Sequence, residues 1–492
     1  MPSTQLDAII VGAGFAGIGA AIQLKRQGLD NFVVLDREAD LGGTWYVNHY
    51  PGLTVDVPTT TYSYYFEPNP NWNRLFSTGA EIKQYADNVA DKYDIRRHIR
   101  FNATVESARW DEEAKLWSVT LADGDSLTAR YLITATGFLS QPFTPEIPGI
   151  HSFEGKVVHT ADWDDSYDPA NRKIGIIGTG ATAVQLIPEL AKDAADLTVY
   201  QRTAIYVVPK VDIKFSARAK RLFARVPLTQ RAIRAITDWL YELMISVGVL
   251  RYTPRITLAA ADLAKMWRFA TIRDKELREK LTPDYDFGCK RPTFSNKYYR
   301  SFTKPNVHLQ TSGIDHIEAD GIVANDGTKA VIDTLVLATG YDIWEANFPA
   351  FEVIGRDGRN LGKWWRGTRF QAYQGVAVPY FPNFLSLASP YAFLGLNFFN
   401  SMEYQMRHME RLFGELKRRA ATTFEITEEA NTRYLDRMTE LLGGTLFTQG
   451  NCASARSYYF NPSGEPTLLR PMSTRNAVRE ASSYPVSDYR IS

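Results

Sequence analysis

The stretch Asp7-Ala8-Ile9-Ile10-Val11-Gly12-Ala13-Gly14-Phe15-Ala16-Gly17 joins a short apolar run to a glycine-rich turn. The apolar run is typical of a buried parallel strand, and residues 18–27 after the turn have the apolar spacing of a helix. Residues 32–35 form a second apolar run that ends at Asp36. Strand, glycine turn, helix and strand together make the βαβ unit that binds the pyrophosphate of a dinucleotide at the helix N-terminus.

The same pattern occurs a second time. Residues 173–177 predict a strand, which is followed by the turn Gly178-Thr179-Gly180-Ala181-Thr182-Ala183, a helix over 183–191 and a strand over 197–200. A lone glycine fingerprint is weak evidence, but each copy here has its strand, helix and strand. The sequence therefore predicts an α/β fold with two dinucleotide-binding Rossmann-like domains. The alternative, two glycine loops that bind nothing, is disfavoured by the repeated context.

The two units differ in the charge at the end of their second strand. Asp36 stands as far after Gly12 as Arg202 stands after Gly178. An acid at this position accepts a hydrogen bond from a free ribose 2′-hydroxyl, whereas a base suits a 2′-phosphate. We therefore expect FAD (or NAD) in the first unit and NADPH in the second. A chain that holds a flavin and a reduced nicotinamide is a flavoenzyme.

Composition excludes several other classes. Of the 492 residues, 45% are hydrophobic and 23% are charged, as in a globular protein of two to four domains, and the net charge of +1 gives no reason to expect a nucleic-acid partner. The only two cysteines, Cys289 and Cys452, are too few for a disulfide framework and too far apart for the paired redox cysteines of flavin disulfide reductases. The histidines show no metal-ligand spacing, so we expect no metal.

Location is predicted from two further features. The first expected strand begins at Asp7, which leaves no room for a signal peptide. The longest apolar helical stretch, residues 239–252, contains Glu242 and is too short to span a bilayer. We expect a cytoplasmic enzyme without stable membrane insertion.

Two apolar runs that end in Ala-Thr-Gly, at residues 131–137 and 335–340, suggest domain boundaries near 140 and 340. We expect an FAD-binding domain in two parts, residues 1–140 and 341–492, with the C-terminal segment in the second part. An NADPH-binding domain, residues 141–340, lies between them and carries a helical subdomain over about 215–285. Aromatic clusters near 62–72 and 380–399 predict either a large apolar pocket or ordinary core packing.

The linker between the two units carries a longer motif. Phe153-Glu154-Gly155-Lys156-Val157-Val158-His159-Thr160-Ala161-Asp162-Trp163-Asp164 fits F-x-G-x-x-x-H-x-x-x-W-[P/D], and Gly42-Gly43-Thr44-Trp45, Tyr50-Pro51-Gly52 and Asp56 form a second motif. In both motifs and over nearly its whole length, the chain resembles the type I Baeyer–Villiger monooxygenases, class B flavoprotein monooxygenases. The first motif distinguishes this family from other flavin monooxygenases.

The resemblance implies a reaction. NADPH reduces FAD, O₂ adds at flavin C4a, and the peroxyflavin anion attacks a ketone, whose adduct rearranges to an ester or lactone. The protonated intermediate can oxidise sulfides. The site must stabilise an oxyanion and exclude water. Two alternatives remain: a flavin monooxygenase that oxygenates only sulfur or nitrogen centres, and a non-catalytic redox module that binds FAD and NADPH.

The resemblance also assigns residues. Arg291, in Gly288-Cys289-Lys290-Arg291-Pro292, matches the catalytic arginine, whose fixed charge and fork of donors suit an anion beside the flavin. Asp56 matches the active-site aspartate, and we expect it to pair with Arg291 and position it. The alternatives are a surface arginine in a loop and an aspartate that caps the turn after Pro51-Gly52.

The phosphate of NADPH is assigned to Arg202, Thr203 and Lys290, which match the residues that hold it through charge-assisted hydrogen bonds. His159 and Trp163 are interpreted as joining domain movement to the position of NADP, not as an acid or a base. The expected cofactor-binding residues are Gly12, Gly14, Phe15, Ala16, Gly17, Asp36, Thr44, Trp45, Asp56, Tyr62, Val105, Gly178, Thr179, Gly180, Ala181, Thr182, Ala183, Arg202, Thr203, Lys290, Arg291 and Tyr458.

Three positions depart from the family pattern. Asp36 stands where many relatives have a glutamate, with a shorter reach and the same acceptor chemistry. Ala388-Ser389-Pro390-Tyr391 replaces a Gly-Pro-Asn-like turn near the flavin. Ser457-Tyr458-Tyr459 stands where many relatives place a tryptophan at the nicotinamide ribose, which makes Tyr458 the candidate for that contact.

Overall fold

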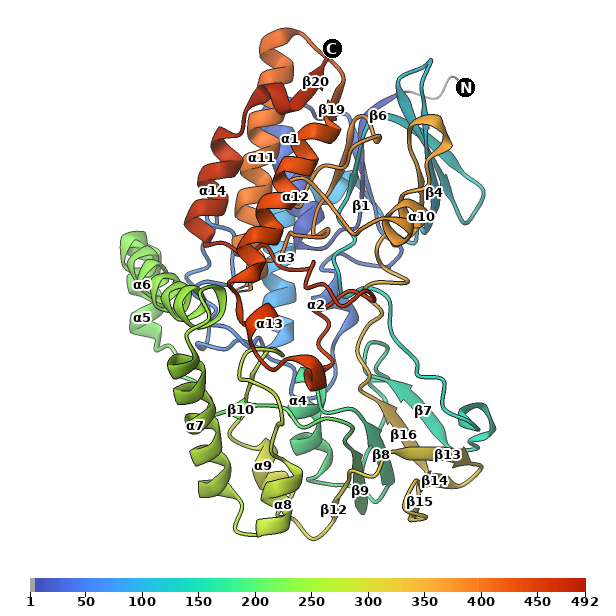
Figure 1. The fold of residues 1–492 in the computed structure, drawn as a ribbon, viewed down its shortest axis with the longest axis vertical. Helices are drawn as coiled ribbons and strands as arrows, with labels where there is room; N and C mark the ends of the chain where they lie inside the picture. The colour runs from blue at the N-terminus through green and yellow to red at the C-terminus, as the bar shows by residue number, and fades with distance from the viewer. Residues whose placement is uncertain (1–4, 396) are drawn as a thin grey trace.

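The computed structural model describes residues 5–395 and 397–492, which form two α/β lobes stacked along the long axis of the molecule (Figure 1). The larger sheet has the strand order β17-β4-β5-β6-β1-β2-β3, with β18 paired to β6. Its strands are β1 (Leu6–Val11), β2 (Phe32–Leu35), β3 (Ile99–Arg100), β4 (Val105–Asp111), β5 (Leu116–Leu121), β6 (Ser126–Thr134), β17 (Glu352–Ile354) and β18 (Phe384–Ser386).

The centre of this sheet is parallel and fully covered. Ile9 pairs with Val33 of β2 on one side and with Leu132 of β6 on the other, and it is wholly buried, as a strand in the middle of a parallel sheet requires. Helix α1 (Phe15–Gln27) starts three residues earlier than the sequence pattern predicts, because the glycine turn itself contributes its first turn. At Gly17 an added Cβ would lie 1.8 Å from the Gly12 carbonyl oxygen, so only glycine allows this approach.

The second lobe repeats the arrangement with a five-stranded parallel sheet. Its strand order is β12-β9-β8-β16-β7. The strands are β7 (Lys156–His159), β8 (Lys173–Ile177), β9 (Asp196–Tyr200), β12 (Val307–Gln310) and β16 (Thr334–Leu337). Helix α4 (Ala181–Leu190) starts inside the second glycine turn, as α1 does in the first. The prediction of an α/β fold with two Rossmann-type units is confirmed.

The C-terminal third of the chain returns to the first lobe. Strands β17 and β18 extend its sheet, and helix α11 (Phe398–Arg419) packs against α1 (Figure 1). Helix α11 starts at Phe398, because the Asn397 side chain accepts a hydrogen bond from the Asn400 amide and caps it. Helices α12 (Glu428–Gly443) and α14 (Thr474–Ser483) stand beside α11.

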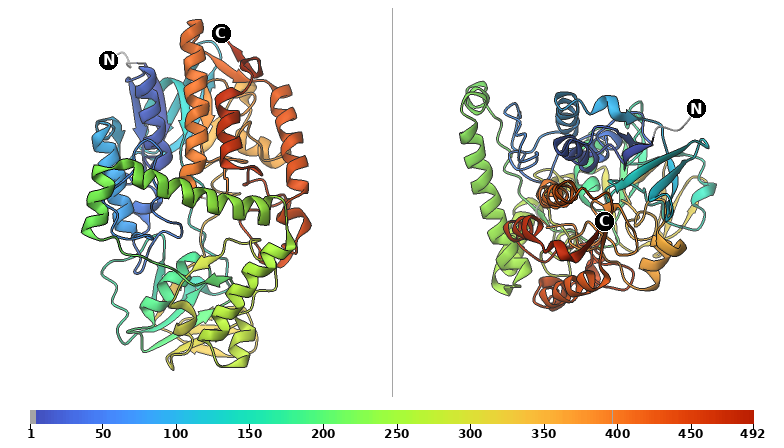
Figure 2. Two further views of the ribbon diagram at one scale, coloured as in Figure 1. Left: turned by 90° about the vertical axis from the view of Figure 1, so that its left-hand side faces the viewer. Right: turned by 90° about the horizontal axis from the view of Figure 1, so that it is seen from above.

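The expected helical subdomain is present. It consists of α5 (Ala217–Arg225), α6 (Pro227–Ile245), a π-helical turn (Ser246–Leu250), α7 (Pro254–Thr271) and α8 (Lys275–Lys280). Figure 2 shows α6 lying across the outside of the molecule. Among the described helices, none is long and apolar enough to cross a membrane.

The two cysteines are joined to each other, which the sequence did not predict. Cys289 and Cys452, 163 residues apart, form a disulfide. Tertiary contacts bring the two loops together: the Asp286 amide donates to the Asn451 carbonyl (3.0 Å), and the Asn451 amide donates to the Asp286 carboxylate (2.9 Å). The bond is a single cross-link between loops, not a framework of several disulfides.

Candidate functional site

A cleft of about 1450 Å³ joins the two glycine turns. Every expected cofactor-binding residue lines it except Gly17 and Ala183. Gly17 lies against the Gly12 carbonyl, and Ala183 is wholly buried in the core of the second lobe. Both allow close helix–strand packing, which is the role of the last small residue of such a turn.

The glycine turns are shaped to bring backbone close to a ligand. Gly12 and Gly178 have φ values of +108° and +121°, and an added Cβ would lie 2.5 Å and 2.3 Å from the carbonyl oxygens of Ala135 and Ala338. An added Cβ at Gly180, by contrast, would meet nothing within 4 Å. The backbone there is open on the side where a cofactor would lie.

The N-termini of the two helices are free of competing groups. Neither N-cap, Gly14 of α1 or Gly180 of α4, has a side chain that accepts a hydrogen bond from the helix, and the first turns contain no acid. The unpaired amides and the helix dipole therefore favour an anion at both places. Both turns fit the pyrophosphate of a dinucleotide.

Asp36 lines the cleft and also supports the first turn. Its carboxylate accepts hydrogen bonds from the amides of Ala13 (2.5 Å) and Glu38 (2.9 Å). Burial raises the pKa of Asp36 above its ordinary value, and these two backbone hydrogen bonds oppose the rise. Each oxygen keeps a second lone pair, so the carboxylate can still accept from a ribose hydroxyl.

Asp56 and Arg291 meet inside the cleft as expected. Arg291 Nε lies 2.7 Å from Asp56 Oδ2, and Arg291 Nη2 lies 3.2 Å from Asp56 Oδ1. The side chains are 26% and 23% exposed, so the pair is open to the cleft. Burial acts to raise the pKa of Asp56, but the charge and hydrogen bonds of Arg291 outweigh it and the pKa lies below its ordinary value. The pair is fully ionised at neutral pH.

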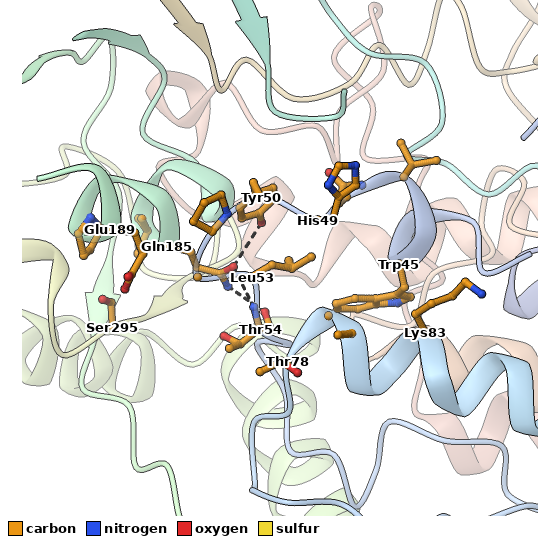
Figure 3. Close-up of a pocket in the computed structure, with 18 of the residues that line it drawn as sticks. Trp45, His49, Tyr50, Leu53, Thr54, Thr78, Lys83, Gln185, Glu189 and Ser295 are labelled. Atoms are coloured by element: carbon orange, nitrogen blue, oxygen red, sulfur yellow. Dashed lines mark hydrogen bonds between the residues drawn. The ribbon is translucent and has the colours of Figure 1, made fainter. Parts of the chain in front are cut away.

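The loop that carries Asp56 is held by the helix of the second glycine turn. Gln185 of α4 donates from Nε2 to the Thr54 carbonyl (2.9 Å), and its Oε1 accepts from the Thr54 amide (3.2 Å) and from the Tyr50 hydroxyl (3.3 Å) (Figure 3). Lys210 also donates to the Thr54 hydroxyl (2.6 Å). A neighbouring pocket of about 1050 Å³ lies against the same loop (Figure 3). The position of Asp56 is thus tied to the second nucleotide unit.

Three cations that line the cleft, Arg202, Lys290 and Arg456, act on one another. Burial lowers the pKa of Lys290, and the charge of Arg202 lowers it further. Burial also lowers the pKa of Arg202, with a contribution from Arg456. No ion pair with a carboxylate is found for any of the three within the part of the chain that the structure describes. Mutually repelling cations of this kind suit a phosphate.

Arg456 was not predicted. It lies in the C-terminal segment, two residues before Tyr458, and only the tertiary fold brings it to Arg202. Its sequence context contains no phosphate-binding pattern, so no local signal could have identified it. Thr203 acts through its carbonyl, which accepts from the Thr179 hydroxyl (2.8 Å) and joins the strand end to the second glycine turn.

The aromatic clusters are divided between pocket and core. Tyr62 and Phe398 line the cleft, whereas Trp72 and Phe399 are buried in the core of the first lobe. Tyr458 lines the cleft, and its carbonyl accepts from Trp344 Nε1 (3.1 Å). The unusual segment Ala388–Tyr391 does not line the cleft. Ala388 is 3% and Tyr391 0% exposed.

His159 and Trp163 have structural surroundings. His159 Nε2 lies 3.3 Å from the Phe143 carbonyl oxygen and 3.4 Å from the Thr339 hydroxyl, and burial lowers its pKa. The neutral ring ties the linker to the end of β16. Trp163 is buried against Tyr167. In the described ranges no group of three or more potential ligands is placed to hold a metal.

Comparisons with known proteins identify the family of the chain. Residues 9–236 match the family model described as pyridine nucleotide-disulphide oxidoreductase. Neither Cys289 nor Cys452 lines the cleft, so the site lacks a redox disulfide. A Baeyer–Villiger monooxygenase of Streptomyces coelicolor is 36% identical over 484 residues, which cover 98% of this chain and 92% of that protein.

Solved structures extend the likeness to the whole fold. Cyclohexanone monooxygenase from Rhodococcus sp. Phi1 bound to NADP⁺ has a TM-score of 0.88 and 28% identity, with 99% of each chain covered. The OTEMO complex with FAD and NADP also has a TM-score of 0.88, with 27% identity and all of both chains covered. The chain belongs to the Baeyer–Villiger monooxygenase family of flavin-dependent monooxygenases.

Proposed function

We propose that the protein uses FAD, NADPH and O₂ to convert ketones into esters or lactones, and that it also oxidises sulfides. The observation that carries this proposal is the Asp56–Arg291 pair, which faces the cleft between two anion-binding glycine turns. Ketone oxidation requires a cation where negative charge develops on oxygen, and the forked ion pair supplies one inside the cleft.

The cofactors are assigned by the shape and charge of each unit. The first glycine turn and Asp36 would hold FAD, and the second turn with Arg202, Lys290 and Arg456 would hold NADPH. When bound, NADPH supplies the hydride and FAD supplies the ring at which O₂ is activated. We assign residues 1–140 and 341–492 to the FAD-binding domain and residues 141–340 to the NADPH-binding domain.

Arg291 is the catalytic residue in this proposal. Its guanidinium offers fixed charge and several donors to an oxyanion at the carbonyl carbon, and removal of one such donor typically costs about 2.7–4 kcal/mol of transition-state stabilisation. Asp56 is a positioning residue, because it acts by holding the guanidinium in one plane. Since the pair is preorganised, the charge needs no rearrangement during the reaction.

Product analysis tests the proposal. The purified enzyme is supplied with NADPH and, side by side, an apolar ketone and an alkyl aryl sulfide. Ester and sulfoxide are both expected. Sulfoxide without ester would favour an oxygenase of sulfur or nitrogen centres alone. Failure to consume O₂ with NADPH and any substrate would favour a non-catalytic redox module.

A further inference from the structure

Helix α6 has its polar side chains on the inside. Gln230, Arg234, Asp238 and Glu242 follow one another at intervals of four residues and therefore share one face. Gln230 is 3% and Arg234 6% exposed. A surface helix normally turns its polar face to water, so this helix is reversed.

This polar face is fixed to the body of the protein by hydrogen bonds. The side chain of Gln230 donates to the Asn69 carbonyl (2.6 Å), and Arg234 donates to the Ser63 carbonyl (2.9 Å). The Glu242 carboxylate accepts from the Thr474 amide at the start of α14 (2.6 Å). Hydrogen bonds near both ends of α6 and in its middle therefore fix its orientation.

The opposite face of α6 is apolar and exposed. Its large side chains are each 47–71% exposed: Leu228, Ile236, Trp239, Leu240, Leu243 and Met244. The neighbouring helices also carry large exposed apolar side chains, Leu222 on α5 and Leu258, Met266 and Phe269 on α7. We call these ten residues the outer apolar face. Figure 2 shows α6 on the periphery, with nothing of the chain outside it.

The charge around this face is strongly positive. Residues 211–255 contain nine Lys and Arg and three Asp and Glu, a net charge of +6, although the whole chain carries only +1. The three acids are engaged within the protein: Asp212 with Arg74, Asp238 with Arg234, and Glu242 with the Thr474 amide. The charge offered outward comes from Arg218, Arg221, Arg225 and other exposed bases.

We propose that the outer apolar face docks the protein on the surface of a membrane rich in anionic phospholipid. Exposed leucines and a tryptophan enter the boundary between headgroups and acyl chains, and the surrounding arginines meet the lipid phosphates. The helix lies in the plane of the interface and does not span it, in agreement with its length and with Glu242 on its inner side.

A second copy of the chain fits the same surface less well. In a two-fold dimer the same patch meets itself, so a segment of net charge +6 would face another of +6. An anionic lipid surface suits both the apolar side chains and the positive charge around them. It has negatively charged headgroups and, beneath them, an apolar layer of acyl chains.

Helix α6 and the turn after it lie near the loop that carries Lys290 and Arg291, although no residue of the outer apolar face lines the cleft. Tyr241 lies on α6, and its pKa, raised chiefly by burial, is raised further by Asp56 and lowered by Arg291. After α6, Val249 lies next to Gly288, two residues before Lys290, since an added Cβ at Gly288 would be 3.5 Å from its side chain. A membrane bound at α6 would hold apolar molecules, dissolved in its acyl chains, near the cleft.

Vesicle cosedimentation of the flavin-loaded protein tests the proposal without any substrate, so its outcome is independent of the proposed reaction. The vesicles are equimolar phosphatidylglycerol and phosphatidylcholine, or phosphatidylcholine alone. We expect binding to the anionic vesicles to be at least tenfold tighter and to weaken as salt is raised. Binding that is absent, or equal for both vesicles, would overturn the proposal.

Variants locate the contact. Trp239→Glu with Leu243→Glu, and separately Arg221→Glu with Arg225→Glu, should each reduce binding at least tenfold. Val331→Glu is the matched control, because Val331 is 50% exposed on β15 (Lys329–Val331), outside the helical subdomain, and should bind as wild type does. Flavin content and thermal midpoint are measured for each, and double variants that bind vesicles like wild type would contradict the assignment.

Two further measurements test the docking proposal without relying only on variants that introduce charge. Brominated anionic lipids should quench a component of tryptophan fluorescence that the conservative Trp239→Phe variant lacks. Sedimentation velocity gives the oligomeric state without lipid. A wild-type dimer that Trp239→Glu with Leu243→Glu dissociates, together with no vesicle binding, would assign the face to a second copy instead.

Discussion

Asp56 and Arg291 are 235 residues apart in the sequence and form a forked ion pair, with 2.7 Å between Nε and Oδ2 and 3.2 Å between Nη2 and Oδ1. The two contacts fix the plane of the guanidinium as well as its position. A lysine, which is a point charge on a flexible stem, could not be held in this way. The pair also connects two loops. Asp56 lies in the loop after the first nucleotide unit, and Arg291 lies in the loop that the disulfide at Cys289 joins to the C-terminal segment.

Cofactor choice should depend on the cations at the second unit. Arg202→Ala should raise the KM for NADPH about tenfold or more, since each 1.4 kcal/mol is a factor of ten. Arg456→Ala should act in the same direction, because Arg456 also lines the cleft and its charge lowers the pKa of Arg202. Steady-state kinetics with NADPH and NADH measure this.

NADH is the internal control, because it has no 2′-phosphate, and its kinetics should hardly change in either variant. Arg419→Ala, at the end of α11, is the matched surface control. An equal loss with both donors would show that Arg202 does not read the phosphate.

Flavin binding should depend on the first glycine turn. Gly14→Val places a branched side chain at the N-cap of α1, where backbone must approach the pyrophosphate. The purified variant should lack yellow colour or fail to fold, and absorbance of the flavin per polypeptide measures this. Gly414→Ala is the matched control, because an added Cβ in that part of α11 meets nothing within 4 Å. A Gly14→Val protein with one FAD per chain would mean that another unit holds the flavin.

The nucleotide units were predictable because their chemistry is local. Strand, glycine turn and helix follow one another within about 25 residues, and the pattern of each is set by its own sequence. The apolar spacing predicts the start of α1 three residues later than the structure shows. Spacing alone cannot show that residues of the glycine loop already form the first turn of the helix. The motif assigns Gly17 and Ala183 to the cofactor site, and in the structure their small size also allows close helix packing.

Contacts over long distances were not predictable from residues alone. The Asp56–Arg291 pair was expected only because of the family resemblance. Arg456 and the disulfide between Cys289 and Cys452 depend on how the C-terminal segment folds back, and no periodicity reports this. The reversed helix α6 looks like an ordinary amphipathic helix in the sequence, because its pattern is the same whichever face is inside.

The disulfide should stabilise the fold. Cys452→Ser removes a cross-link between residues 163 apart, and loss of a native disulfide typically costs roughly 2–4 kcal/mol. We expect a lower thermal midpoint and a higher KM for NADPH, because Lys290 directly follows Cys289. Alkylation of the unreduced protein followed by mass spectrometry should find no free thiol. Two alkylated cysteines and an unchanged midpoint would contradict this bond.

Stability should fall in mild acid because of His408. This ring is buried, stacks on Tyr484 with centroids 4.4 Å apart, and has Nε2 2.6 Å from the Tyr489 hydroxyl oxygen. Burial first, and then the charges of Arg470 and Arg411, lower its pKa to about 3. An unfolded histidine has a pKa of about 6.5, so between these values the unfolded state binds more protons and stability falls as pH falls.

Thermal unfolding between pH 7.5 and 5 checks this expectation. The midpoint of the wild type should fall with pH, and that of His408→Gln, which has no ring to protonate, should fall less. His151→Gln, at an exposed histidine, is the control and should follow the wild type. Identical pH profiles for wild type and His408→Gln would exclude this residue as a cause.

The central claim is that Arg291 acts on the reacting oxygen and that Asp56 acts through it. Arg291→Ala should bind FAD normally yet lose ketone oxidation by at least ~10²–10³-fold, the scale of a removed oxyanion donor. Asp56→Ala should lose less. The double variant should be little worse than Arg291→Ala alone, because groups that act as a unit are not additive. Arg291→Lys should recover only part of the activity, since the fork is lost.

The decisive measurement is the ester formed per NADPH consumed, for the wild type, both single variants and the double variant. We predict that Arg291→Ala continues to oxidise NADPH while almost no ester forms, with the electrons appearing as hydrogen peroxide. An Arg291→Ala enzyme that makes ester at near wild-type yield would contradict the account.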